Sequence, residues 1–96
     1  MDLQRVDLNL LVHLDVLLRE KNVTRASEQL GITQPAMSNI LRRLRKLFND
    51  PLLIRSSEGM TPMERALELQ PRVRELLADL TQLLEPRTEL RPYTSS

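Results

Sequence analysis

The sequence predicts an all-α fold with one small β-hairpin, which ends in a long amphipathic helix. Apolar residues, largely leucines, recur at spacings of three and four over most of the 96 residues. Glycines number 2 and aromatic residues make up 2% of the chain, a composition that favours helices over sheets. The spacing changes near Asp50-Pro51, where a short strand pair is expected instead. A chain of this length is enough for one small domain.

The composition excludes several classes of function. Cysteine is absent and His13 is the single histidine, so neither a disulfide nor a metal site is expected. The sequence has no Gly-rich phosphate loop and no nucleophile with a partner base, so we expect neither an enzyme nor a bound cofactor. No apolar run approaches the roughly 20 residues of a membrane span, and the N-terminus lacks the pattern of a secretory signal. We therefore expect no membrane association and a cytoplasmic location.

The first helix is predicted from Asp7 to about Glu20. The Asp7 carboxylate can cap its N-terminus, and leucines at helical spacing give it a broad apolar face. We expect this face to be central to the core, with His13 on the solvent side. Lys21-Asn22 is expected to end the helix.

A short helix, a tight turn and a second helix are predicted between residues 23 and 42. Thr24 is the expected cap of the short helix, and Gly31 fits a left-handed stop at its end. Thr33 can cap the next helix, whose first turn tolerates Pro35 because no intrahelical N–H bond is made there. This order of elements is that of a helix-turn-helix.

The helix that follows Thr33 has two chemically different faces. At about 100° per residue, one stripe consists of Met37, Leu41, Leu44 and Phe48. The opposite arc consists of Gln34, Ser38, Asn39, Arg42, Arg45 and Lys46. Residues 33–55 hold five cationic side chains and one carboxylate, which leaves +4 in a chain of net charge +1. Short polar residues followed by cations are typical of a recognition helix in the DNA major groove, and a solvated helix surface is the alternative.

Residues 52–61 are predicted to form a hairpin directly after this helix. Residues 52–55 have the composition of a short strand, residues 56–59 that of a turn, and Met60-Thr61 can return as a second strand. A hairpin in this place is the wing of a winged helix-turn-helix, which then occupies residues 1–61. An irregular loop is the alternative.

A long helix is predicted over residues 62–85. Thr61-Pro62-Met63-Glu64 matches a capping box with Thr61 as the cap, and a kink or local loosening is expected at Pro71. Its apolar seam consists of Ala66, Leu69, Val73, Leu76, Leu80 and Leu83, widened by Leu77 and Leu84. A small domain does not cover a seam of this length, so we expect a homodimer; packing wholly within its own domain is the alternative. We expect residues 86–96 to be a flexible hinge.

Three motifs carry a resemblance to a known family: TRA at 24–26, QPAMSN at 34–39, and DPLL at 50–53 followed by Arg55. With them, residues 7–84 resemble the N-terminal domain of LysR-type transcriptional regulators, in particular the nodulation and aromatic-degradation branch. The resemblance implies a winged helix-turn-helix on double-stranded DNA, whose linker helix dimerises antiparallel to its mate. It also implies a longer regulator, with an effector domain for a small-molecule inducer and RNA polymerase as a further candidate partner.

The resemblance also assigns roles to single residues. Thr24 and Arg25 match contacts to the DNA backbone, and Arg55 matches a wing arginine that reaches the minor groove or its phosphates. Asn39 stands where many members have arginine, and an asparagine can instead pair with adenine. The full set of candidate DNA-binding residues is Thr24, Arg25, Thr33, Gln34, Pro35, Ser38, Asn39, Arg42, Arg43 and Arg55.

Two functional hypotheses follow. In the first, a dimer binds an interrupted palindrome: the cations hold phosphates and give salt-dependent affinity, while the short polar residues select bases. In the second, the chain is a helical protein-interaction module that dimerises through the leucine seam and has no affinity for duplex DNA.

Overall fold

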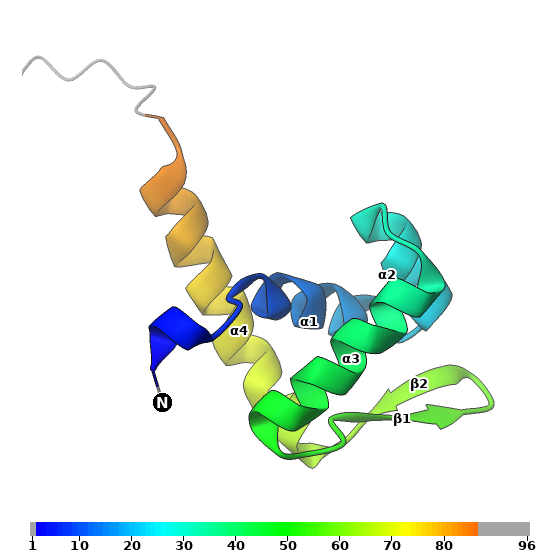
Figure 1. Ribbon diagram of the computed structural model, residues 1–96. Coiled ribbons are helices and arrows are strands. Elements are labelled where there is room, and N and C mark those ends of the chain that lie inside the picture. The colour runs from blue at the N-terminus through cyan, green and yellow to red at the C-terminus, as the bar shows by residue number, and fades with distance from the viewer. Residues whose placement is uncertain (1, 87–96) are drawn as a thin grey trace, which may run out of the picture.

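The computed structural model describes residues 2–86 as a set of helices with one β-hairpin. The elements follow one another as η1 (Leu3–Arg5), α1 (Asn9–Glu20), α2 (Val23–Leu30), α3 (Gln34–Phe48), β1 (Leu53–Ser56), β2 (Gly59–Pro62) and α4 (Glu64–Leu84). The two strands pair antiparallel and form the wing (β1 and β2 with the turn between them). In Figure 1, the wing projects to one side of α3, whereas the C-terminal part of α4 extends away from the other helices. The predicted all-α fold with a small β-wing is confirmed.

The apolar face of α1 forms the centre of the core, as predicted. Leu14 and Leu17 of α1 have no solvent exposure, and neither have Met37 and Leu44 on the apolar stripe of α3. Ala26 of α2 is also fully buried, and its small side chain allows α2 to approach closely. Each buried leucine or methionine contributes about 1.5–3 kcal/mol, so this packing fixes which face of α3 remains outside.

The ends of α2 and α3 confirm two predictions and contradict one. Gly31 stops α2 with a left-handed φ of +68°, and the Thr33 hydroxyl accepts the N–H of Ala36 at 3.2 Å to cap α3. The prediction of Thr24 as the cap of α2 is wrong. Asn22 caps α2 instead, because its extended backbone brings Oδ1 to 2.9 Å from the N–H of Arg25.

The start of α4 also differs from the prediction. Thr61 does not cap this helix, because strand pairing continues as far as Pro62, and the Thr61 hydroxyl donates to Ser56 Oγ at 2.9 Å. Met63 occupies the cap position without a side-chain bond. Its N–H donates to the carbonyl oxygen of Leu52 at 2.7 Å, which ties the start of α4 to the start of the wing.

The apolar seam of α4 divides into two parts. Ala66, Leu69 and Val73 are buried against the chain's own core. The prediction that these three residues face a partner is therefore wrong, because the chain covers them itself. The second part lies largely outside the core. Leu77 is partly buried, whereas four leucines are between 39% and 78% exposed: Leu76, Leu80, Leu83 and Leu84.

α4 runs without interruption through Pro71. None of the helices within residues 2–86 is long and apolar enough to span a bilayer. Pro86 follows the end of α4, and the remainder of the predicted hinge, residues 87–96, lies outside the described residues.

The wing is fastened to the end of α1 by its second strand. The N–H of Met60 donates to the carbonyl oxygen of Lys21 at 2.9 Å. Gly59 has a φ of +119°, and a Cβ at this position would lie 2.5 Å from the same oxygen. A side chain at Gly59 would therefore push the wing away from α1.

We predict that Gly59→Ala destabilises the protein by about 2–4 kcal/mol, because it combines a backbone clash, a lost hydrogen bond and a strained φ. Gly31→Ala is the matched control: its φ is also positive, but no heavy atom of residues 2–86 lies within 4 Å of the point that its Cβ would occupy, so the loss should be about 1–2 kcal/mol. The measurement is equilibrium denaturation at one fixed protein concentration. Equal losses for the two variants would contradict the close approach at Gly59.

Candidate nucleic-acid interface

The polar arc of α3 lies on the outside of the molecule. Gln34, Ser38, Asn39 and Arg42 are all exposed, whereas the stripe on the opposite side of the helix is buried in the core. Thr33 and Pro35, which the sequence also places in the candidate set, are exposed in the first turn of the same helix. The face predicted to meet a nucleic acid is therefore open to solvent.

A hydrogen bond joins the first turns of α2 and α3. The Gln34 side-chain amide donates to the hydroxyl of Thr24. This bond leaves the Gln34 carbonyl oxygen and one amide hydrogen available for another partner. It also brings together two helix N-termini, whose first N–H groups lack partners within the helix and favour anions such as phosphate.

Asn39 and Arg42 form a second polar pair one turn further along α3. The Arg42 guanidinium donates to Asn39 Oδ1. An amide oxygen has two lone pairs, so Asn39 can still accept one more hydrogen bond while its NH₂ group donates. The pair therefore presents both donors and an acceptor, which is the combination that the edge of adenine requires.

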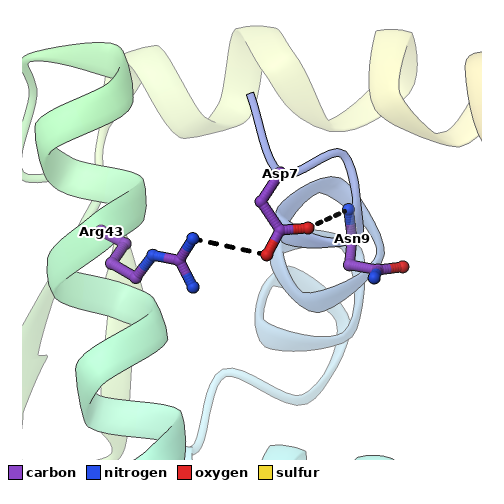
Figure 2. Close-up of polar contacts among 3 residues, drawn as sticks. All are labelled: Asp7, Asn9 and Arg43. Atoms are coloured by element: carbon purple, nitrogen blue, oxygen red, sulfur yellow. Dashed lines mark hydrogen bonds and ion pairs between the residues drawn. The ribbon is translucent and has the colours of Figure 1, made fainter. Parts of the chain in front are cut away.

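Arg43 has a different environment from Arg42. Figure 2 shows its guanidinium directed toward Asp7, and Nη2 lies 3.4 Å from Asp7 Oδ2. The other carboxylate oxygen of Asp7 accepts the N–H of Asn9 at 3.1 Å, so Asp7 contacts the first residue of α1, although Leu8 rather than the predicted Asp7 occupies the cap position. A carboxylate beside Arg43 offsets its charge, and a phosphate would have to compete with Asp7 for it.

The wing brings Arg55 close to the start of α2. Arg55 is exposed, and it lines a shallow groove together with Asn22, Thr24 and Met60. The structure thus places Thr24, Gln34 and Arg55, which are distant in sequence, around one edge of the molecule. Arg25 is exposed as well, but it shares a separate groove with the carboxylates of Glu20 and Glu28.

Arg45 is the residue whose role the sequence did not reveal. It belongs to the predicted polar arc, yet its Nε donates to the carbonyl oxygen of Pro51 at 2.9 Å and its Nη2 to that of Leu53 at 2.7 Å. Its partners are main-chain atoms between α3 and the wing. A sequence pattern gives no signal for such a contact, because every residue has a carbonyl group.

Comparison with known proteins identifies the family. The profile described as "Bacterial regulatory helix-turn-helix protein, lysR family" matches residues 8–67. The HTH-type transcriptional activator NagR of Ralstonia sp is 45% identical over 96 residues, which cover 100% of this chain and 32% of the relative. Nodulation protein D 3 of Rhizobium leguminosarum bv. phaseoli is 40% identical over 90 residues, which cover 94% of this chain and 30% of the relative.

Solved structures share the fold. A probable transcriptional regulator of Pseudomonas aeruginosa, PA0477, superposes with a TM-score of 0.81 at 37% identity, covering 93% of this chain and 31% of that one. The DNA-binding domain of BenM in a complex with catB site 1 DNA has a TM-score of 0.77 at 23% identity, covering 82% of this chain and 89% of that one. The chain spans about a third of the length of the curated relatives it matches. By the extent of these matches, the chain belongs to the lysR family of bacterial regulatory helix-turn-helix proteins.

Proposed function

We propose that this chain binds double-stranded DNA sequence-specifically, with the exposed arc of α3 in the major groove and the wing at the flanking minor groove. The observation that carries the proposal is the orientation of α3. Its apolar stripe is buried, so Gln34, Ser38, Asn39 and Arg42 are turned outward together. The first turns of α2 and α3 supply amide groups for phosphates, and the polar side chains supply base contacts.

The comparisons support this proposal, and they extend it to a longer regulator. NagR is named as a transcriptional activator, and the BenM domain with this fold was crystallised with DNA. Because the relatives are about three times longer, we assign a small-molecule inducer and contact with RNA polymerase to a regulator of that length. DNA binding in a bacterium places such a regulator in the cytoplasm.

The experiment that tests the proposal is selection of bound sequences from a random duplex pool. We expect enrichment of an interrupted inverted repeat, and we expect Asn39→Ala to relax the preference at one symmetry-related pair of positions, at a cost of about 1–3 kcal/mol. Dimers that enrich no sequence would instead support the protein-interaction module. Equal loss of affinity on random DNA for Asn39→Ala would contradict base contact by this residue.

We predict that the two neighbouring arginines of α3 differ in the salt dependence of binding. In a dimer, Arg42→Ala should reduce the slope of log affinity against log salt by about two, since one phosphate contact is lost per copy. Arg43→Ala should reduce it less, because Asp7 already neutralises part of this charge.

The matched background for this comparison is Asp7→Asn, which keeps a cap oxygen for the N–H of Asn9 but removes the carboxylate charge. In that background the effect of Arg43→Ala should increase. Fluorescence anisotropy over a series of salt concentrations measures all the slopes. An Arg42→Ala slope equal to that of the unsubstituted chain would contradict its phosphate contact.

We propose further that two copies associate through the exposed half of α4. Leu77, Leu80 and Leu84 line a groove with Leu8, which directly precedes α1, and with Val12 of α1; both of these residues are more than 40% exposed. The predicted dimerisation residues do not include Leu8 and Val12, although a spacing of four residues places two side chains on one helix face. A second copy would cover an apolar surface that is larger than the leucines of α4 alone provide.

The distribution of charge favours an antiparallel arrangement of the two α4 helices. Arg72, Leu76 and Asp79 line one groove along α4, with the cation and the carboxylate on opposite sides of the leucine in sequence. Around a twofold axis near Leu76, Arg72 of each copy meets Asp79 of the other. A parallel arrangement would place like charges opposite each other.

We predict that Arg72→Glu weakens dimerisation and that adding Asp79→Arg restores it. Two like-charge pairs per dimer, at about 0.5–1 kcal/mol each, correspond to about fivefold to thirtyfold in the dissociation constant. Sedimentation equilibrium of the single and double variants measures the effect. Failure of Asp79→Arg to rescue would argue against the antiparallel register.

A further inference from the structure

We infer that Arg45 is a positioning residue, which fixes the wing relative to α3 so that one rigid unit meets both grooves of the DNA. The inference rests on the proposed DNA binding. It adds a role for a side chain that contacts no DNA itself and acts through Arg55 on the wing. The structure supports it through three features: the fork of hydrogen bonds from Arg45, the strained turn that the fork spans, and the burial of the residue at the centre of that turn.

The fork connects the last turn of α3 to both sides of the junction with the wing. Nε of Arg45 donates to the carbonyl oxygen of Pro51 at 2.9 Å, and Nη2 donates to that of Leu53, the first residue of β1, at 2.7 Å. Both distances are those of good hydrogen bonds. A planar guanidinium holds its donors in a fixed geometry, so two acceptors bound to it are fixed relative to each other and to the helix.

The segment that the fork spans is a tight turn centred on Leu52. The N–H of Leu53 donates to the carbonyl oxygen of Pro51 at 2.7 Å, and Leu52 has a left-handed φ of +64°. A three-residue turn with positive φ is rare and strained for a side chain of this kind. Such a conformation persists only where the surroundings hold it in place.

Three further contacts hold Leu52. Its side chain is fully buried, its N–H donates to Asp50 Oδ1 at 2.8 Å, and its carbonyl oxygen accepts the N–H of Met63 at 2.7 Å. These contacts determine where the turn lies, and the next residue, Leu53, has a fully buried side chain as well. Arg45 supplies the bond to Leu53, at the point where β1 begins.

The same fork separates Arg45 from the other cations of α3. Arg45 is partly buried, and two of its donor groups are occupied by main-chain oxygens. Arg42, by contrast, is exposed and binds a neighbouring side chain that can itself face DNA. Removal of the Arg45 fork should therefore act on DNA binding through the wing and Arg55, since Arg45 itself is not expected to bind a phosphate.

The test is a double-mutant cycle between Arg45 and Arg55, measured on a duplex enriched by the unsubstituted chain. Arg45→Met keeps an aliphatic stem and removes the fork. In the unsubstituted background, Arg55→Ala should weaken binding by about fivefold to thirtyfold, because one exposed charged contact is lost in each of two copies. In the Arg45→Met background the same change should cost less than about twofold, because the wing no longer holds Arg55 in place.

Two further variants separate geometry from charge. Arg45→Lys keeps the positive charge but lacks the planar fork, so it should lose the coupling to Arg55 as Arg45→Met does. Arg74→Met is the matched control on the exposed face of α4, and it should leave the coupling intact. Full coupling in Arg45→Lys, or independent effects of Arg45→Met and Arg55→Ala, would overturn the positioning role.

A second measurement requires no DNA. In amide hydrogen exchange, Arg45→Met should accelerate exchange across β1 and β2 by about tenfold or more relative to α1, because the wing opens separately from the core. Unchanged exchange in the wing would overturn the inference even if the chain bound no duplex. A steep loss of protection throughout α1 would show instead that Arg45 supports the whole fold, which also contradicts a role specific to the wing.

Discussion

The burial of the α3 stripe against α1 is the constraint on which the rest of the structure depends. Met37 and Leu44 have no solvent exposure, and they meet a leucine face of α1 that is equally buried. Rotation of α3 about its axis would expose these residues and bury polar ones, at a cost of several kcal/mol. The helix therefore has one stable orientation, and its polar arc is exposed as a consequence.

The wing gains its position from contacts with elements that the core has already placed. Met60 is bonded to Lys21 at the end of α1, and Leu52 is bonded to Met63 at the start of α4. A two-stranded hairpin is only marginally stable by itself, so these attachments and the Arg45 fork determine its direction. The wing, α3 and the start of α4 consequently meet at one junction, and a shift of one of them changes the positions of the other two.

The arginines of α3 differ in the groups that lie beside them. Arg42 is exposed beside a neutral amide, Arg43 lies beside the carboxylate of Asp7, and Arg45 is bonded to main-chain oxygens. Three arginines within four positions of one helix thus have three different environments. A net charge counts them equally, whereas only a cation without a strong internal partner is fully available to a phosphate.

The sequence by itself determined the order of the elements and the apolar and polar faces of α3, because helical periodicity and turn residues act over a few positions. Tertiary structure decided the remainder. Asn22 rather than Thr24 caps α2, strand pairing delays the start of α4 past Thr61, and the chain's own core covers Ala66. It also turned Arg45 toward Pro51 and Leu53. Each of these outcomes depends on which of several possible partners a residue contacts. Only the folded chain brings those partners close together, so a local sequence pattern cannot predict the choice.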